Sequence, residues 1–282
     1  MADTYSVRSH GDDIDFGALT GLAGHWLGAN GVNLIAVPDQ KQSFEVLIAP
    51  YTESLTITKI PATTPNRGLT ARESIPTLQY ATKISDANTG ALMHVECGFW
   101  EKPDPTMNSG FDVFRIASVP HGNAVEAMGI TTVSAGPPVI DTSVTAFPTA
   151  VPARMLPLGY TDRYLLPSPV PGFSAKFPNQ YLVDHLEQQA QNGLTVTETV
   201  TIQVSTQNQG SISNIISLET NANPTEFDAT FWLETLEDEQ GHVYRQLQYS
   251  QRVMLQFPVG LPGKVEMFNW PHINVNTLQM IT

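Results

Sequence analysis

Short hydrophobic runs separated by turn residues dominate the chain. Most of these runs are rich in β-branched and aromatic residues, and Gly, Pro, Asn and Asp lie between them. Because β-branched and aromatic side chains suit a pleated sheet, this pattern is typical of strands. About ten strands with so few helices indicate a closed antiparallel barrel or a β-sandwich. The clearest predicted strands span residues 43–48, 53–60, 79–84, 91–100, 111–118, 124–132, 194–205, 212–220, 227–236, 242–256 and 270–280.

A short helix is predicted at residues 15–22, directly before a strand that carries Gly24, Trp26 and Gly28. The glycines permit sharp curvature, and Trp26 is large enough to plug one end of a barrel. The motif agrees with a calycin-like barrel, although a buried Trp beside Gly occurs in many all-β proteins.

A proline-rich segment interrupts the strand pattern. Because dense prolines cannot donate into sheet ladders, residues 132–193 are predicted to form an insertion. The segment also contains Phe147, Met155 and Leu156, so it should pack against something. It would serve as a lid, or as an arm on a second subunit of a homodimer. Nine of the 21 prolines lie here, at positions 137, 138, 148, 152, 157, 167, 169, 171 and 178.

The insertion is predicted to be partly helical. Residues 179–191 carry an apolar stripe at helical spacing, with Asn179 as a candidate N-cap and Gly193 as a candidate end. No repeat or low-complexity tract divides the chain, so residues 1–282 are predicted to form a single domain.

Composition and charge narrow the classes of partner. Hydrophobic residues make up 41% of the chain and charged residues only 15%, so a substantial core is expected and the polar surface is mostly uncharged. The 14 Lys and Arg against 27 Asp and Glu give a formal net charge of −13. Because phosphate backbones and anionic lipids attract basic patches, neither nucleic acid nor a membrane is predicted as a partner.

The sequence also predicts a cytoplasmic protein. The N-terminus shows no apolar signal-peptide segment, and no apolar run approaches the ~18 residues that a membrane span needs. Cys97 is the only cysteine, which excludes an internal disulfide. It lies within an apolar strand pattern, which predicts a buried packing role rather than a nucleophile.

Common catalytic signatures are absent. The chain has no GxSxG elbow, P-loop, GxGxxG or HExxH motif, and its carboxylates form no pair at a fixed spacing. Histidines and a few aromatic motifs remain as candidates, and no catalytic residue is assigned.

Several motifs, in the same order, resemble those of the nitrobindins, which are heme-binding β-barrels with a fatty-acid-binding-protein-like fold. Residues 24–28 match Gly-x-Trp-x-Gly, and residues 93–99 match Met-His-x-Glu-x-Gly-Phe. Residues 116–129 fit Ile-Ala-x-x-x-Gly-x-x-Glu-x-x-x-Gly with one extra residue before the first Gly. Residues 247–252 match Leu-x-Tyr-x-x-Arg, and residues 271–278 resemble the Pro-His-Leu-x-Ala-x-Leu ending with its last Leu one residue late.

This resemblance implies an antiparallel calycin-like barrel that binds heme b. By the resemblance, His272 is the axial ligand of the heme iron, Met93 and His94 line the pocket, and Val253 lies near the heme face. A neutral imidazole is a common protein ligand of heme iron. In the family, ferric heme converts peroxynitrite to nitrate and ferrous heme binds nitric oxide. The implied partner is therefore a small molecule such as peroxynitrite, nitric oxide or a peroxide, with no protein group in the sixth iron position.

The resemblance covers residues 22–129 and 194–278, so the insertion has no counterpart in the family. Strand alternation adds an expectation for the pocket, because neighbouring side chains face opposite sides of a sheet. If Met93 faces inward with Val95, Cys97 and Phe99, then His94 faces outward unless a bulge intervenes.

The face of His272 is left open by the sequence. His272 shares it with Asn274 and Asn276, which fits either a polar cavity wall or solvent exposure.

Two other functions are compatible with the same barrel. A heme-free carrier would hold a fatty acid or another small apolar ligand, with the insertion as its portal. A peroxidase-like heme enzyme would need an acid–base residue beside the iron, for which His94 and His121 are the candidates.

Overall fold

The computed structural model describes residues 14–39, 43–66, 72–151, 159–261 and 264–281. The helical elements are the 3₁₀ helices η1 (Gly17–Leu22) and η3 (Asp162–Leu165) and the α-helices α1 (Gln180–Gln191) and α2 (Ile216–Asn221). Within this part of the chain, no helix has both the length and the apolarity that a membrane crossing demands. The strands are β1 (Gly24–Asp39), β2 (Ser43–Lys59), β3 (Thr64–Pro65), β4 (Ser74–Ile75), β5 (Thr77–Asp86), β6 (Leu92–Glu101), β7 (Val113–Val119), β8 (Asn123–Ala135), β9 (Thr195–Ser205), β10 (Ser211–Asn214), β11 (Asn223–Glu237), β12 (Val243–Leu261) and β13 (Lys264–Ile281).

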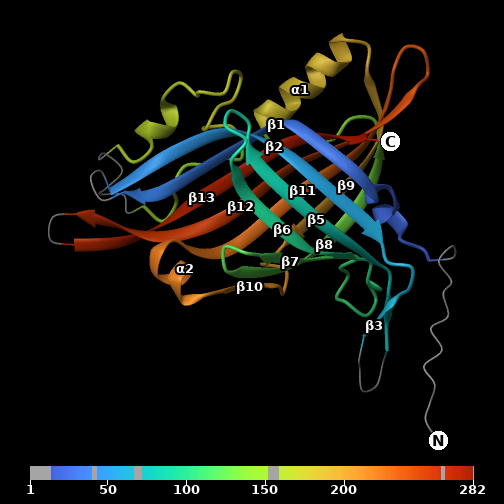
Figure 1. The fold of residues 1–282 in the computed structure, drawn as a ribbon, viewed down its shortest axis with the longest axis horizontal. Helices are drawn as coiled ribbons and strands as arrows, with labels where there is room; N and C mark the ends of the chain where they lie inside the picture. The colour runs from blue at the N-terminus through green and yellow to red at the C-terminus, as the bar shows by residue number, and fades with distance from the viewer. Residues whose placement is uncertain (1–13, 40–42, 67–71, 152–158, 262–263, 282) are drawn as a thin grey trace, which may run out of the picture.

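Ten of the described strands close into an antiparallel barrel (Figure 1). Hydrogen-bonded neighbours follow the order β8-β7-β6-β5-β2-β1-β13-β12-β11-β9, and β9 pairs back onto β8. The same edge of β8 has two partners, because β10 pairs with residues 123–126 and β9 with residues 128–135. The prediction of an all-β antiparallel barrel is confirmed, with β10 as an extra strand.

Inward and outward side chains alternate along the barrel strands. On β7, Val113, Arg115, Ala117 and Val119 are buried, and the residues between them are more exposed. Polar and even charged side chains therefore project into this barrel beside its apolar core.

The η1 end of the barrel is filled with apolar side chains. Trp26 is fully buried in a core that includes Leu19 and Leu22, and its indole N–H donates to the Leu22 carbonyl at 2.8 Å. A short helix thus precedes a strand with a buried tryptophan, as predicted, although the helix is of the 3₁₀ type.

The insertion packs on the outside of the barrel. It begins later than predicted, because β8 continues to Ala135. Tyr160, Tyr164 and Phe173 form a second core with side chains of β1, β2, β11, β12 and β13. Residues 152–158, including Met155 and Leu156, lie outside the described residues. The insertion therefore adds a second core beside these barrel strands.

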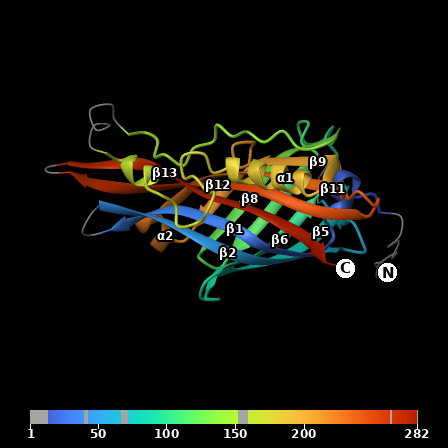
Figure 2. The same cartoon turned by 90° about the horizontal axis from the view of Figure 1, so that it is seen from above.

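Helix α1 forms where the sequence predicts it, and Gly193 follows its end with a φ of +79°. The predicted side-chain cap is wrong. The Asn179 amide donates to the Asp141 carbonyl at 2.8 Å, and its oxygen accepts from the Ser250 hydroxyl at 2.7 Å. Asn179 thus holds the start of α1 on the outer face of β12, along which the helix lies (Figure 2).

The strand predicted over residues 212–220 is wrong in its second half, where the chain forms α2. The Ile215 N–H donates to the Gly122 carbonyl at 2.9 Å, and the helix begins at the next residue. The β-branched residues Ile212, Ile215 and Ile216 favour a strand locally. A helix forms instead, because the chain must here cross from β10, which pairs with β8, to β11 at the end of the barrel.

A buried polar layer lies between α1 and the barrel. Glu234, Gln246 and Gln248 are fully buried there. Gln246 donates to Glu234 at 2.6 Å and accepts from Gln189 of α1 at 2.7 Å. Burial raises the pKa of Glu234 to about 8 and outweighs the opposing effect of the Gln246 hydrogen bond. Glu234 therefore stays protonated at neutral pH.

Stability should fall as this carboxyl ionises. A raised folded-state pKa means that the folded protein loses stability between the unfolded pKa and about pH 8. Glu234→Gln should remove that loss and make the variant more stable than wild type at pH 9 by roughly 2–4 kcal/mol, with little gain at pH 4. Urea unfolding at several pH values measures this, with the exposed Glu237→Gln as control. A Glu234→Gln effect that does not change with pH would contradict the prediction.

Candidate functional site

An interior cavity of about 380 Å³ lies at the α2 end of the barrel. Its lining comes from eight barrel strands, with Leu218 and Ala222 at the α2 segment and no residue of the described insertion. Twelve of the 21 lining residues are apolar, and nine polar or charged residues lie among them. This size and lining are typical of small-molecule and cofactor sites.

Strand β6 presents the opposite face to the one expected. Glu96, Gly98 and Trp100 face inward, whereas the predicted core residue Cys97 is exposed. His94 lies on the inward face and lines the cavity, so the expectation that regular alternation turns it outward is wrong. A register shift where β6 meets Ile84 and Ser85 brings Met93 to the cavity as well.

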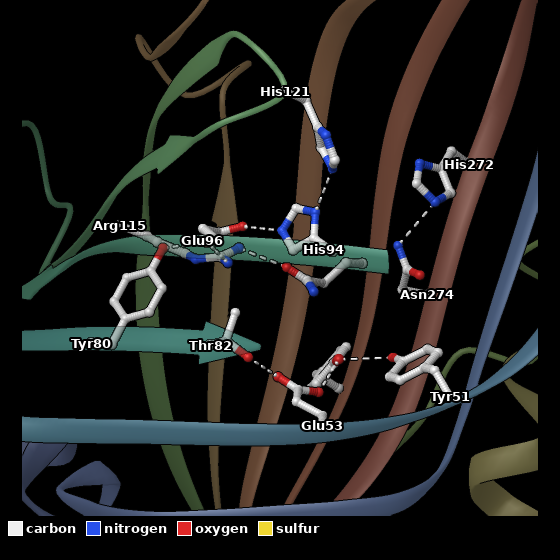
Figure 3. Close-up of polar contacts among 12 residues, drawn as sticks. Tyr51, Glu53, Tyr80, Thr82, His94, Glu96, Arg115, His121, His272 and Asn274 are labelled. Carbon is white, nitrogen blue, oxygen red and sulfur yellow. Dashed lines mark hydrogen bonds and ion pairs between the residues drawn. The ribbon is translucent and has the colours of Figure 1, made fainter. Parts of the chain in front are cut away.

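His94 stands between a second histidine and a carboxylate (Figure 3). Its Nδ1 lies 3.2 Å from His121 Nε2, and its Nε2 lies 3.3 Å from a Glu96 oxygen. An ionised Glu96 can only accept, so His94 Nε2 carries a proton and donates to it. Burial and the nearby His94 lower the pKa of His121. The three residues form a chain from the exposed rim to the buried wall.

Glu96 is ionised because Arg115 pairs with it. Burial opposes its charge, but Arg115, His94 and Tyr80 outweigh burial and hold the pKa of Glu96 at about 2. Arg115 Nη2 lies 2.6 Å from Glu96, and its Nη1 donates to Gln251 at 2.7 Å. Tyr80 donates to the same Glu96 oxygen as Arg115.

The Arg115 guanidinium is also enclosed by aromatic rings. It lies 4.9 Å from the centroid of Phe227 and within 5.6 Å of those of Tyr80, Trp100 and Phe231. Such rings stabilise a desolvated cation. The pair with Glu96 is therefore held rigidly on the cavity wall.

His272 lies across the cavity from this chain. Its Nε2 is 2.7 Å from Asn33 Oδ1 and 3.2 Å from Asn274 Nδ2. One ring nitrogen cannot donate and accept at once, and the shorter contact makes Nε2 the donor to Asn33. The lone pair then lies on Nδ1, which faces the side of His94 and His121 (Figure 3).

The imidazole of His272 is neutral. Burial, followed by the charges of His94 and His121, lowers the pKa of His272 to about 4. Val253 pairs with His272 across β12 and β13 and lines the same cavity. The sequence allows His272 to face either a polar cavity wall or solvent, and in the structure it lies on the polar cavity wall. The predicted site residues His272, Met93, His94 and Val253 thus meet at one cavity.

A second polar network lies in the barrel beneath the cavity. Glu53 accepts from Tyr249 at 2.5 Å, from Asn276 at 2.8 Å and from Thr82 at 2.8 Å. Tyr51 lies 2.8 Å from the Tyr249 hydroxyl. Burial raises the pKa of Glu53, hydrogen bonds partly offset this, and the nearby Glu96 raises it further.

Sequence reasoning missed Asn33, Glu96, Arg115 and Gln251 as site residues. The His94-x-Glu96 spacing places both side chains on one face of a strand, which was the available signal. The other three residues come from separate strands, so only the barrel closure brings them to the cavity.

The cavity offers single imidazoles to a metal centre rather than a cage of ligands. Among the described residues, no group of three or more His, Cys, Asp or Glu side chains could hold a metal ion. His272 could supply a single imidazole ligand to an iron whose other ligands come with a cofactor. The apolar lining and the neutral His272 fit heme b on this count.

Comparisons with known proteins assign no family. No family model matches the chain, and no curated protein matches it. Among solved structures, the chain is similar to the crystal structure of Rv2717c from M. tuberculosis, with 15% identity and a TM-score of 0.46. That alignment covers 94% of this chain and 96% of the other.

The buried ion pair of the site should be essential to folding. Glu96→Gln leaves the Arg115 charge buried without its partner and should lower the unfolding free energy by about 3–5 kcal/mol. The double variant Glu96→Gln/Arg115→Met should recover much of that loss. Urea unfolding measures both, with the exposed Glu45→Gln as control. Equal stability of Glu96→Gln and wild type would show that the pair contributes nothing.

Proposed function

We propose that the barrel cavity binds heme b through His272 and that the protein handles small oxidants or nitric oxide. The most concrete reaction is isomerisation of peroxynitrite to nitrate. The observation that carries the proposal is the neutral His272 imidazole on the wall of an otherwise largely apolar cavity. Bound heme would supply an iron that takes an oxygen or nitrogen ligand from the substrate.

The residues around His272 have distinct roles in this proposal. Asn33 accepts from Nε2 at 2.7 Å, which fixes the tautomer and leaves Nδ1 as the donor atom to iron. Val253, directly across from His272, would pack beside the heme. Leu218 and Ala222 help to exclude water at the α2 end of the cavity.

A Soret band tests the proposal. Wild type should bind hemin stoichiometrically, and His272→Ala should lose the band. Asn33→Leu should weaken hemin binding by about 10–100-fold, because the ring loses its orienting partner. The exposed His242→Ala is the matched control and should bind as wild type. The loaded protein should also speed peroxynitrite decay beyond free hemin.

The absence of a stoichiometric band in wild type would contradict heme binding and favour the carrier. In that case, solvent extraction followed by mass spectrometry should release a reproducible apolar ligand from the purified protein. A band that survives in His272→Ala would instead assign the iron ligand to another residue.

The chain of His121, His94 and Glu96 favours a peroxidase-like enzyme as the second candidate. His121 is exposed and exchanges protons with solvent, while His94 lies beside the cavity and is oriented by Glu96. Such an arrangement suits proton transfer to and from a peroxide.

One assay distinguishes the peroxidase-like function from the isomerisation of peroxynitrite. If the protein is peroxidase-like, His94→Gln should keep the Soret band but lower hydrogen-peroxide-dependent oxidation of guaiacol by about 10²-fold or more. His25→Gln, an exposed histidine of β1, serves as control. Equal oxidation rates in the hemin-loaded wild type and in free hemin would rule out this candidate.

A further inference from the structure

Helix α2 and the residues beside it form part of the wall of the interior cavity. This segment begins where β10 ends, crosses the end of the barrel and leads into β11 (Figure 1). It contributes Leu218 and Ala222 to the cavity lining, whereas no described residue of the insertion lies there. Within the described part of the chain, α2 and not the insertion therefore covers the cavity at this end.

The helix is held only weakly along its length. None of its residues is buried, and Ile216 is 78% exposed. Among the described residues, the side chains of residues 216–221 form hydrogen bonds only within α2, where Thr220 and Asn221 donate to carbonyls of its first turn. The backbone bonds at its ends stay between residues 215 and 222. Elements with so few outside contacts open locally at a lower free energy than the core strands.

The two ends of the segment are tied together at one point. Asn214, the last residue of β10, donates from Nδ2 to the Asn223 side-chain oxygen at 3.1 Å and to the Pro224 carbonyl at 2.8 Å. These two hydrogen bonds form a clasp between the residues that precede and follow α2. The Ile215 N–H also donates to the Gly122 carbonyl at 2.9 Å, which fixes this point to the turn before β8. The segment is thus a short flap that is fastened only at its base.

The inner side of the flap faces empty space. Leu218 and Ala222 are the half-buried residues of the segment, and both line the cavity. They are four residues apart and therefore lie on one side of the helix. Because a side chain beside a void lacks packing partners on that side, outward movement of these two residues sacrifices few contacts.

We infer that α2 is the gate of the interior cavity, and that residues 216–222 move outward from the Asn214 clasp to admit a ligand. The clasp holds the closed position, and Leu218 and Ala222 complete the cavity wall when the gate is shut. The inference concerns access to the cavity and not the identity of the ligand, so it does not depend on heme binding.

Labelling of a thiol inside the cavity tests the gate without any ligand. In a Cys97→Ser background, Ala117→Cys places the only thiol of the chain on the cavity wall, at a position that is 4% exposed. Dithiodipyridine is neutral and larger than water, so it should react with this thiol at a rate set by the opening of α2. Val125→Cys, at a second buried position of the wall, serves as a repeat if Ala117→Cys does not fold.

Loosening the clasp should speed the reaction. Asn214→Ala removes the donor of the clasp and should raise the labelling rate by about 3–10-fold, which is the usual effect of losing one hydrogen bond. Asn208→Ala is the matched control. Asn208 also donates from Nδ2 to a backbone carbonyl, that of Met128 at 3.0 Å, but it lies outside the α2 segment, so its loss should leave the rate unchanged.

Urea distinguishes movement of the gate from unfolding of the barrel. Opening a short segment exposes little surface, so the labelling rate should change little at urea concentrations well below the unfolding midpoint. A rate that instead rises steeply with urea, in step with global unfolding, would overturn the inference. So would equal rates with and without Asn214→Ala, or an equal increase in Asn208→Ala, because the thiol would then be reached by another route.

Discussion

Closure of the sheet through β8 and β9 is the constraint on which the rest of the structure depends. The two strands approach so closely at Gly129 that an added Cβ would lie 1.6 Å from the Gln203 carbonyl oxygen. Beyond this point β9 leaves the edge of β8, and the short strand β10 takes its place. The regular barrel wall therefore ends there, and α2 crosses the gap. This is the end where the cavity lies, so the way the barrel closes determines where a ligand can enter.

Two buried carboxyl groups inside the barrel have pKa values that are shifted in opposite directions, because their neighbours differ. Glu96 faces the Arg115 cation and is ionised, whereas Glu53 faces only neutral hydroxyl and amide donors and has a raised pKa. The charges of Glu96 and Arg115 cancel, and His272 is neutral at pH 7. A largely apolar ligand can then enter without stranding a buried charge. The polar networks hold the walls in place, and the apolar side chains between them provide the binding surface.

Local sequence pattern predicted most of the strands and α1, whereas the residues that meet at the cavity were named through the resemblance to a known family and not through local pattern. The predictions from local pattern failed where contacts with a strand distant in the sequence determine the structure. On β6, the local pattern predicts that Val95, Cys97 and Phe99 are buried. They point outward, because Glu96 on the opposite face forms an ion pair with Arg115 of β7. No spacing within β6 encodes that partner. The strand prediction for the residues after β10 failed for the same reason. Their β-branched side chains favour a strand, but the chain must cross the gap at the end of the barrel and forms α2 there.

The register of β11 against β12 determines which of their side chains lie on each face of the barrel wall. Arg252 and Asp228 lie on the outer face, whereas their neighbours Val253 and Phe227 line the interior cavity. A slip of one residue between β11 and β12 would turn over one of the two strands, so that either Asp228 or Arg252 would enter the barrel without its partner. Burying that single charge in place of Phe227 or Val253 would be costly, because nothing would compensate its desolvation. The apolar inner face and the charged outer face of the two strands therefore specify the same pairing.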